Sequence, residues 1–224
     1  AVLVDIVGLL VTASFVVPPG SRAEIQEIGV TNFRGVLKEG WKSGFFKYAV
    51  FTAVMGGAVT AVSSFKDVYQ ALMGIPIIYF GVFLGISRVL VALLLLVNQK
   101  IKDFLTLHQF LLARVVLAVA LISVLAFASS PYTVVVVFIL LATFNWSVGA
   151  AEKHYLLDLV RESRSKAMLF SVENQINSIV VAMLAYGIGV AAVETGYRTG
   201  FAVIAVALSI FTVGFFLLSF MRNR

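Results

Sequence analysis

The chain lacks cysteine altogether, has two histidines, and is poor in charge: 12% of its 224 residues are charged, against about a quarter in soluble proteins. The missing cysteines exclude disulfides, thiolate metal sites and thiol nucleophiles, and two histidines leave little for an imidazole metal site. Because 61% of the residues are apolar and the mean hydropathy is +1.02, we expect an integral membrane protein. It should embed in a lipid bilayer and carry no cofactor.

The first residues already form an apolar run, AVLVDIVGLL, without an initiating methionine. Asp5 lies inside this run and no basic region precedes it, which argues against a signal peptide. We therefore expect residues 1–17 to be the end of a preceding transmembrane helix, and the chain to be a fragment of a longer protein.

Six further apolar segments reach the length of about 20 residues that a membrane span requires. They must be helices, because a backbone in lipid satisfies its hydrogen bonds internally and the runs show no alternating barrel pattern. The sequence thus predicts an all-α integral membrane fold with spans at 44–65, 71–97, 105–127, 131–151, 167–192 and 199–220.

Basic residues predict the orientation, since short loops rich in lysine and arginine stay cytoplasmic. All but four of the 17 basic residues lie in segment 18–47, after the second span, in 152–166 and in the final tail. The chain should therefore enter from outside and end in the cytoplasm, as a multi-pass protein of the plasma or inner membrane. The net charge of +6 then reports topology, and we expect no nucleic-acid partner.

Segment 18–43 is neither a span nor a short loop. Pro18 and Pro19 end the opening run, and Ser21 with Glu24 fits a capping box. Apolar residues then recur at near-helical spacing, interrupted by glycines. Either a helix lying on the inner membrane face or a solvated linker helix fits this pattern.

A basic loop followed by three spans and three more of opposite orientation is the layout of an inverted-repeat transporter half. The stretches YQALMGIPIIYFGVFLGISRVLVALLL at 69–95 and RSKAMLFSVENQINSIVVAMLAYGIG at 164–189 resemble the eighth and eleventh helices of the major facilitator superfamily. The resemblance implies a 3+3 inverted repeat at 44–224, a cytoplasmic linker at 18–43, and a first six-helix half that this chain lacks. It further implies a secondary transporter, not an enzyme, that moves a small organic solute by alternating access.

Polar residues deep in a span are costly in lipid, so they are the candidates for the transport site. Arg88 lies near the centre of its span and should bind substrate or a coupling carboxylate. The plainer alternative is a structural arginine that pairs with a neighbouring helix or snorkels to the interface.

Glu173, Asn174 and Asn177 form a polar patch one turn long, where a carboxylate could exchange protons with the cytoplasm. Glu173 could equally stay hydrated or pair with Arg114.

In the fourth span, Asn145 and Trp146 offer an amide and a stacking surface for a ligand. Packing against another helix is the alternative. A stripe of small and polar residues in the first span favours helix packing: Tyr48, Thr52, Gly56, Thr60 and Ser64.

Several glycines also favour packing: Gly81 with Gly85, and Gly187 with Gly189. Gly56-Gly57 could give the first span a flexible point.

The cluster Glu152-Lys153-His154 with Asp158 fits a solvated helix end better than a membrane-embedded active site. A complete seven-span receptor or photoreceptor shares the predicted topology. It fits less well, because the opening segment is short, the linker is long, and the last span has no lysine for a retinal Schiff base.

Overall fold

A computed structural model describes residues 33–160 and 163–221, which are helical apart from short turns and contain no strand. Six helical segments in this part of the chain are long and apolar enough to cross a membrane: Phe45–Leu72, Ile77–Asn98, Leu107–Phe127, Pro131–Leu159, Lys166–Glu194 and Tyr197–Leu217. The predicted all-α membrane architecture with six spans is thereby confirmed. The predicted helix end at 1–17 and the first part of segment 18–43 lie outside the described residues.

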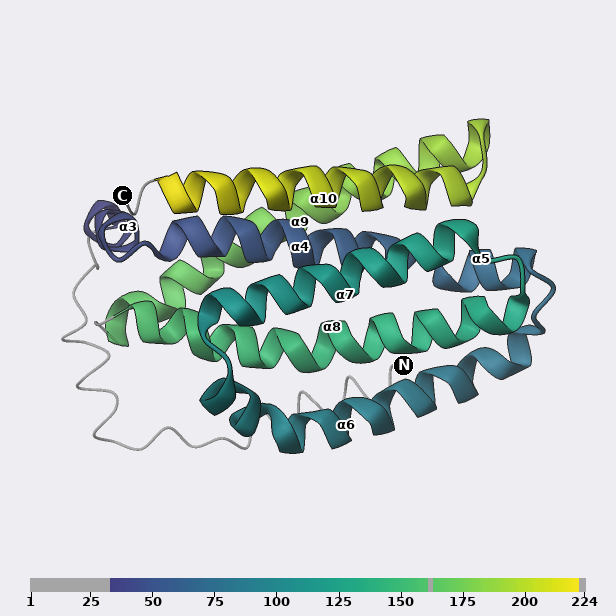
Figure 1. Cartoon of the computed structure of the whole chain (residues 1–224), viewed down its shortest axis with the longest axis horizontal. Helices are drawn as coiled ribbons and strands as arrows, with labels where there is room; N and C mark the ends of the chain where they lie inside the picture. Colours follow the sequence, from purple (N-terminus) through teal and green to yellow (C-terminus); the bar gives the residue numbers. More distant parts are fainter. Residues whose placement is uncertain (1–32, 161–162, 222–224) are drawn as a thin grey trace, which may run out of the picture. The chain divides into compact units, whose positions relative to one another are not determined.

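The helices follow one another along the chain with short connections (Figure 1). They are α3 (Phe33–Lys42), α4 (Phe45–Ser64), α5 (Lys66–Leu72), the 3-10 turn η1 (Ile77–Tyr79), α6 (Phe80–Phe104), α7 (Leu107–Phe127), α8 (Pro131–Leu159), α9 (Ser163–Glu194) and α10 (Tyr197–Met221). All six spans belong to the unit Glu39–Arg224, and the first turns of α3 belong to the preceding unit, Ala1–Lys38.

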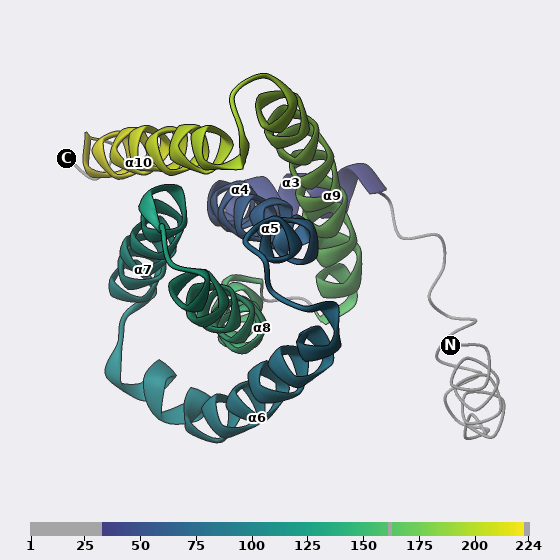
Figure 2. The ribbon, with the colours of Figure 1, turned by 90° about the vertical axis from the view of Figure 1, so that its right-hand side faces the viewer.

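Helix α4 is the central element of the bundle. It contacts α7, α8, α9 and α10 (Figure 2), whereas α6 packs chiefly on α8 at the periphery. In the most apolar stretch of the first span, 72% of the residues are buried. In the corresponding stretches of the α6 span and the α9 span, only 6% of the residues are buried. Two helices of the bundle therefore present most of their apolar surface outward.

Aromatic rings pack α4 against α10, and a glycine lets α4 pack closely against α9. The ring of Phe51 lies 4.2 Å from that of Phe215 and 5.8 Å from that of Phe211, centroid to centroid, which joins α4 to α10. On the other side, a Cβ atom at Gly57 would come within 2.8 Å of Val180 in α9. Gly57 therefore allows α4 and α9 to approach closely, as small residues do between membrane helices.

The first span is longer than predicted and the second begins later. Helix α5 continues the first span to Leu72, so the predicted start of the second span at residue 71 is wrong. Gly74 then adopts a left-handed backbone with φ of 82°, and Pro76 follows before the second span begins at Ile77. A glycine with positive φ ahead of a proline is a strong local end to a helix.

Two groups of connections mark the opposite ends of the bundle. One end carries the α6–α7 and α8–α9 connections and is called the α6–α7 end; the other carries the α7–α8 and α9–α10 connections and is called the α7–α8 end. At the α6–α7 end, Thr106 caps α7: its hydroxyl accepts from the Gln109 amide at 3.4 Å, and the Gln109 side chain accepts from the Thr106 amide at 3.0 Å. At the α7–α8 end, Pro131 occupies the first turn of α8.

Candidate functional site

A cavity of about 570 Å³ lies among α4, α7, α8 and α9. We call it the charged cavity, because it contains two basic and two acidic side chains, Arg114, Lys153, Glu152 and Glu173. Its other polar lining residues are Thr52, Thr60, Asn145, Asn174 and Asn177. Five of the six candidate residues chosen from the sequence thus line one cavity: Asn145, Trp146, Glu173, Asn174 and Asn177.

Four of the polar residues lie at one depth. Thr52, Arg114 and Glu173 each come seven residues after the first residue of their span, and Glu152 comes seven residues before the last residue of its span. Seven residues of α-helix rise about 10 Å. All four spans have these ends at the α6–α7 end, so the charged groups share a level about 10 Å inside the bundle.

Arg114 of α7 and Glu152 of α8 form an ion pair in the interior. Each residue is only 5% exposed. The interpretation of Glu152 as part of a solvated helix end is therefore wrong. Helix α8 continues eight residues beyond the predicted boundary at 151, to Leu159, and a buried arginine at this depth needs a counter-charge.

Glu173 is the second acid at this level and is 7% exposed. Among the described residues, its Oε2 atom has no hydrogen-bond partner. It interacts electrostatically with Lys153 and with Arg114, but the ion pair of Arg114 is with Glu152. Arg114 thus pairs with one carboxylate, and the second carboxylate at this level keeps an oxygen without a partner among the described residues.

Two asparagines of the cavity wall tie helices together. The Asn177 side chain donates to the Ala53 carbonyl at 3.2 Å, which joins α9 to α4. The Asn145 side chain donates to the Thr60 hydroxyl at 3.3 Å, which joins α8 to α4. Asn174 is exposed at the rim of the cavity. Asn145 therefore packs against another helix, as the alternative interpretation had it, and also lines the cavity.

A second cavity of about 280 Å³ adjoins the first, because both are lined by Thr60, Asn145 and Trp146. We call it the basic cavity, since Lys66 and Arg88 are its charged lining residues. The Arg88 guanidinium stacks on the Trp146 ring, 4.5 Å from its centroid. The sixth candidate residue, Arg88, therefore contacts Trp146, which lines both cavities.

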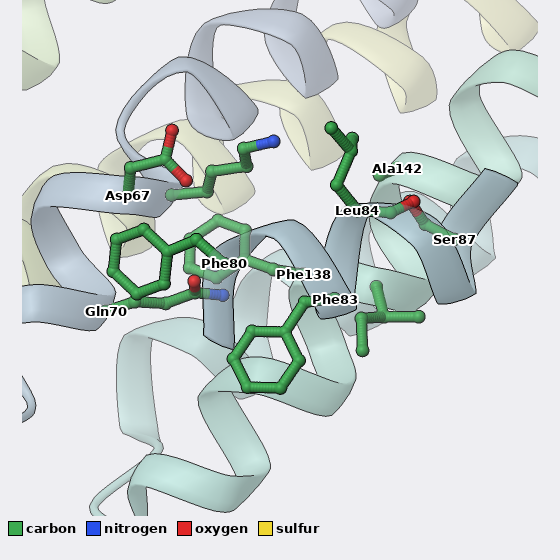
Figure 3. Close-up of a pocket in the computed structure, with 10 residues that line it drawn as sticks. Asp67, Gln70, Phe80, Phe83, Leu84, Ser87, Phe138 and Ala142 are labelled. Atoms are coloured by element: carbon green, nitrogen blue, oxygen red, sulfur yellow. The ribbon is translucent and has the colours of Figure 1, made fainter. Parts of the chain in front are cut away.

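Beyond the basic cavity, toward the α7–α8 end, the space narrows to a pocket of about 20 Å³. It shares Lys66, Leu84, Ser87 and Ala142 with the basic cavity. Figure 3 shows the side chains of Gln70, Phe80 and Phe138 gathered around it. This volume admits about one water molecule, so we call the pocket the constriction.

The expectations about small residues have different outcomes. Thr52, Gly56 and Thr60 line the charged cavity, and their expected part in helix packing is met as well, because a Cβ atom at Gly56 would lie 3.2 Å from the Asn177 side chain and the Thr60 hydroxyl accepts from Asn145. Gly81 and Gly85 were expected to let helices approach closely. A Cβ atom at either would meet nothing within 4 Å among the described residues, and the same holds for Gly187 and Gly189.

Sequence reasoning missed the Arg114–Glu152 pair and the place of Lys66 at the basic cavity. A signal for Glu152 was present: Tyr155 and Leu156 follow it at the three- and four-residue spacing of a continuing helix face. Both are buried. No comparable signal linked Lys66 with Arg88, because their meeting depends on how α6 packs on α8.

No family model, no curated protein and no solved structure matches the chain. The function must therefore be argued from the cavities themselves.

Proposed function

We propose that the protein is a secondary transporter that moves a small organic solute across the membrane by alternating access. The observation that carries this proposal is the series of adjoining cavities through an apolar bundle. The charged cavity, the basic cavity and the constriction share lining residues in sequence, and they narrow from about 570 to about 280 to about 20 Å³. A polar path that is wide toward one end and narrow toward the other suits a carrier with a mid-membrane site.

The outward faces of α6 and α9 support a second six-helix body in the complete protein. Arg88 is exposed on α6, eleven residues after Ile77 and ten before Asn98, and therefore at the middle of its span. An arginine at the bilayer centre faces protein or water and not lipid. We infer that this chain is the C-terminal half of a transporter of the major facilitator type, with the 3+3 repeat that its sequence resembles. The missing half would face Arg88.

The basic loops predict that the α6–α7 end is cytoplasmic. With this orientation, the described conformation is open toward the cytoplasm, because the charged cavity lies on that side of Arg88 and the constriction lies on the other. In a plasma or inner membrane, the same protein would open outward in the second half of its cycle.

Accessibility of a single thiol tests this proposal without knowledge of the solute. The chain contains no cysteine, so an introduced cysteine is the only thiol of this part of the protein, and the unsubstituted full-length protein gives the background labelling. Thr60→Cys places the thiol where the charged and basic cavities meet. In the full-length protein, we expect a membrane-impermeant maleimide to label this position both in inside-out vesicles and in right-side-out vesicles.

Val116→Cys is the matched control, because Val116 is an exposed, outward-facing residue of α7 that lines neither the charged nor the basic cavity. It should be labelled from neither side. Labelling of Thr60→Cys from one side only would contradict alternating access and would favour the receptor alternative.

A further inference from the structure

The charges around the basic cavity are all of one sign. Among the described residues, its lining contains Lys66 and Arg88 and no carboxylate. The nearest acid along the chain is Asp67, which lines the neighbouring constriction and is exposed. A cavity beside the bilayer centre that holds two cations and no acid attracts an anion, because the low dielectric strengthens the interaction.

Among the described residues, Arg88 has the geometry of a ligand-binding group. Within the described residues no carboxylate pairs with it, and its recorded interaction is the stacking on Trp146. Stacking leaves the edge of the guanidinium free, and that edge presents its N–H donors in a planar fork that matches two oxygens of an anionic group. Arg114 shows the contrast, since its carboxylate partner is supplied by α8.

Hydroxyl and amide groups complete the lining. The Ser63 hydroxyl is buried at the cavity and has no hydrogen-bond partner in the described part of the chain. The amide of Asn145 lines the same space. A buried hydroxyl without a partner costs free energy that a ligand oxygen would recover.

The apolar part of the lining consists of Leu84, Val91 and Ala142, with the face of Trp146 beside them. The cavity volume of about 280 Å³ is near the lower limit for small-molecule sites. This combination fits a compact organic molecule that has one anionic group and a short apolar or aromatic body.

We propose that the basic cavity binds a small organic anion, with Arg88 and Lys66 as its charge partners and Ser63 as a hydrogen-bond donor. This inference rests on the proposed transport function, because it names the class of solute that would be carried. The sequence left two possible ligands of Arg88 open, a substrate or a coupling carboxylate. We propose the substrate.

Tryptophan fluorescence can report binding directly. The chain has two tryptophans, and Trp41 is 74% exposed in α3, away from both cavity linings. Within this chain, Trp41→Phe leaves Trp146, against which Arg88 stacks, as the reporter, and Trp41→Phe with Trp146→Phe gives the emission of any tryptophan elsewhere in the full-length protein. We would titrate the full-length Trp41→Phe protein, in nanodiscs of phosphatidylcholine alone, with benzenesulfonate.

We expect a saturable change in Trp146 emission with benzenesulfonate. Neutral benzenesulfonamide and cationic benzyltrimethylammonium, which share the ring but not the charge, should give no such change. Arg88→Gln should weaken binding at least ten-fold, Arg88→Lys less so, and Lys66→Gln by several-fold. Lys100→Gln is the matched control, because Lys100 is an exposed residue of α6 that does not line the cavity, and it should leave binding unchanged.

Equal responses to the three ring compounds, or an unchanged affinity in both Arg88→Gln and Lys66→Gln, would overturn the proposal. Nanodiscs containing phosphatidylglycerol separate a soluble anion from a lipid headgroup. If this lipid alone produced an Arg88-dependent change in emission and abolished the benzenesulfonate response, the ligand would be a lipid and the proposal of a carried solute would fail. If benzenesulfonate did not bind but Thr60→Cys were labelled from both sides, the proposal of an anionic ligand would be refuted. The proposed transport function would then still hold.

Discussion

The charged cavity and the basic cavity share a wall formed by Thr60, Asn145 and Trp146, yet their charges differ. In the charged cavity two bases face two acids, and Arg114 and Glu152 are buried as a pair. In the basic cavity two bases face no acid among the described residues. The difference teaches that arginines in one bundle can differ in what surrounds them: Arg114 has its counter-charge within the fold, whereas Arg88 has none among the described residues and is the one that we propose to bind a ligand.

The largest expected effect is the loss of the acid that pairs with Arg114. Glu152→Ala removes the ion-pair partner of a buried guanidinium and leaves it only the electrostatic interaction with Glu173, which should lower the free energy of unfolding by up to about 3–5 kcal/mol. Arg88→Ala removes an exposed stacking cation and should cost about 1 kcal/mol or less. Circular dichroism during thermal unfolding in detergent measures both.

The double variant Arg114→Met with Glu152→Met is the control, because an apolar pair of similar size is often neutral or stabilising. If Glu152→Ala and Arg88→Ala destabilised the protein equally, the distinction between the two arginines would be lost.

Glycine-to-alanine substitutions compare how tightly α4 and α6 are packed against their neighbours. Gly57→Ala places a methyl group within 2.8 Å of Val180 in α9, and such overpacking should cost about 1–3 kcal/mol. The methyl group of Gly85→Ala on α6 meets nothing within 4 Å in the described part of the chain and should stabilise the helix by up to about 1 kcal/mol. Unfolding midpoints in detergent should therefore shift in opposite directions. A fall for Gly85→Ala as large as that for Gly57→Ala would show that the α6 face is packed in the protein.

Glu173 tests whether the charged cavity couples solute movement to protons. It faces Arg114 of α7 and Glu152 and Lys153 of α8; α4 contributes uncharged lining such as Thr52, and no described charged residue of α10 lies at this level. We expect Glu173→Gln to slow benzenesulfonate uptake driven by a pH gradient at least ten-fold, which is about 1.4 kcal/mol in the barrier.

Exchange of labelled for unlabelled benzenesulfonate needs no net proton movement, so Glu173→Gln should retain it in the same proteoliposomes of full-length protein. Lys100→Gln, which removes an exposed charge of α6 that lines neither cavity, is the control for gradient-driven uptake. Equal loss of uptake and exchange in Glu173→Gln would assign Glu173 to solute binding or folding, and unchanged gradient-driven uptake would exclude it from coupling.

The smallest effects concern two interhelical hydrogen bonds, one between α9 and α4 and one between α6 and α8. Asn177 joins α9 to α4 at 3.2 Å, and Asn98 of α6 donates to the Ser147 carbonyl of α8 at 2.9 Å. Such bonds contribute about 0.6 kcal/mol on average in membrane bundles. Asn177→Leu and Asn98→Leu should each lower the unfolding free energy by about this amount. A loss several times larger for one of them would indicate that its helix depends on a single polar contact.

The sequence predicted the six spans because hydropathy depends on local composition and the bilayer sets the length. Its errors arose where local composition misleads. Glu152, Lys153 and His154 suggested the end of a span, although α8 continues through them. A helix can carry such charges inside a bundle when a neighbouring helix supplies the partner, and a window along one segment does not see that neighbour.

The candidate site was predicted in parts and not as a whole. Arg88, Asn145, Trp146, Glu173, Asn174 and Asn177 were each selected because polar residues are costly in lipid, and all six line the two adjoining cavities. That Arg88 stacks on Trp146 depends on the packing of α6 against α8, which no spacing along one helix specifies. The partner of Arg114 was missed for the same reason.

The constriction has an electrical consequence. For the anion transport proposed above, water filling the charged cavity would carry the potential of the α6–α7 side inward to Arg88, and the transmembrane voltage would fall mainly across the short distance past Gln70, Phe80 and Phe138. An anion that left Arg88 toward the α7–α8 end would then cross most of the field in one step, at about 2.3 kcal/mol per elementary charge for each 100 mV. Passage through the constriction would thereby be the step of the proposed cycle that is most sensitive to voltage.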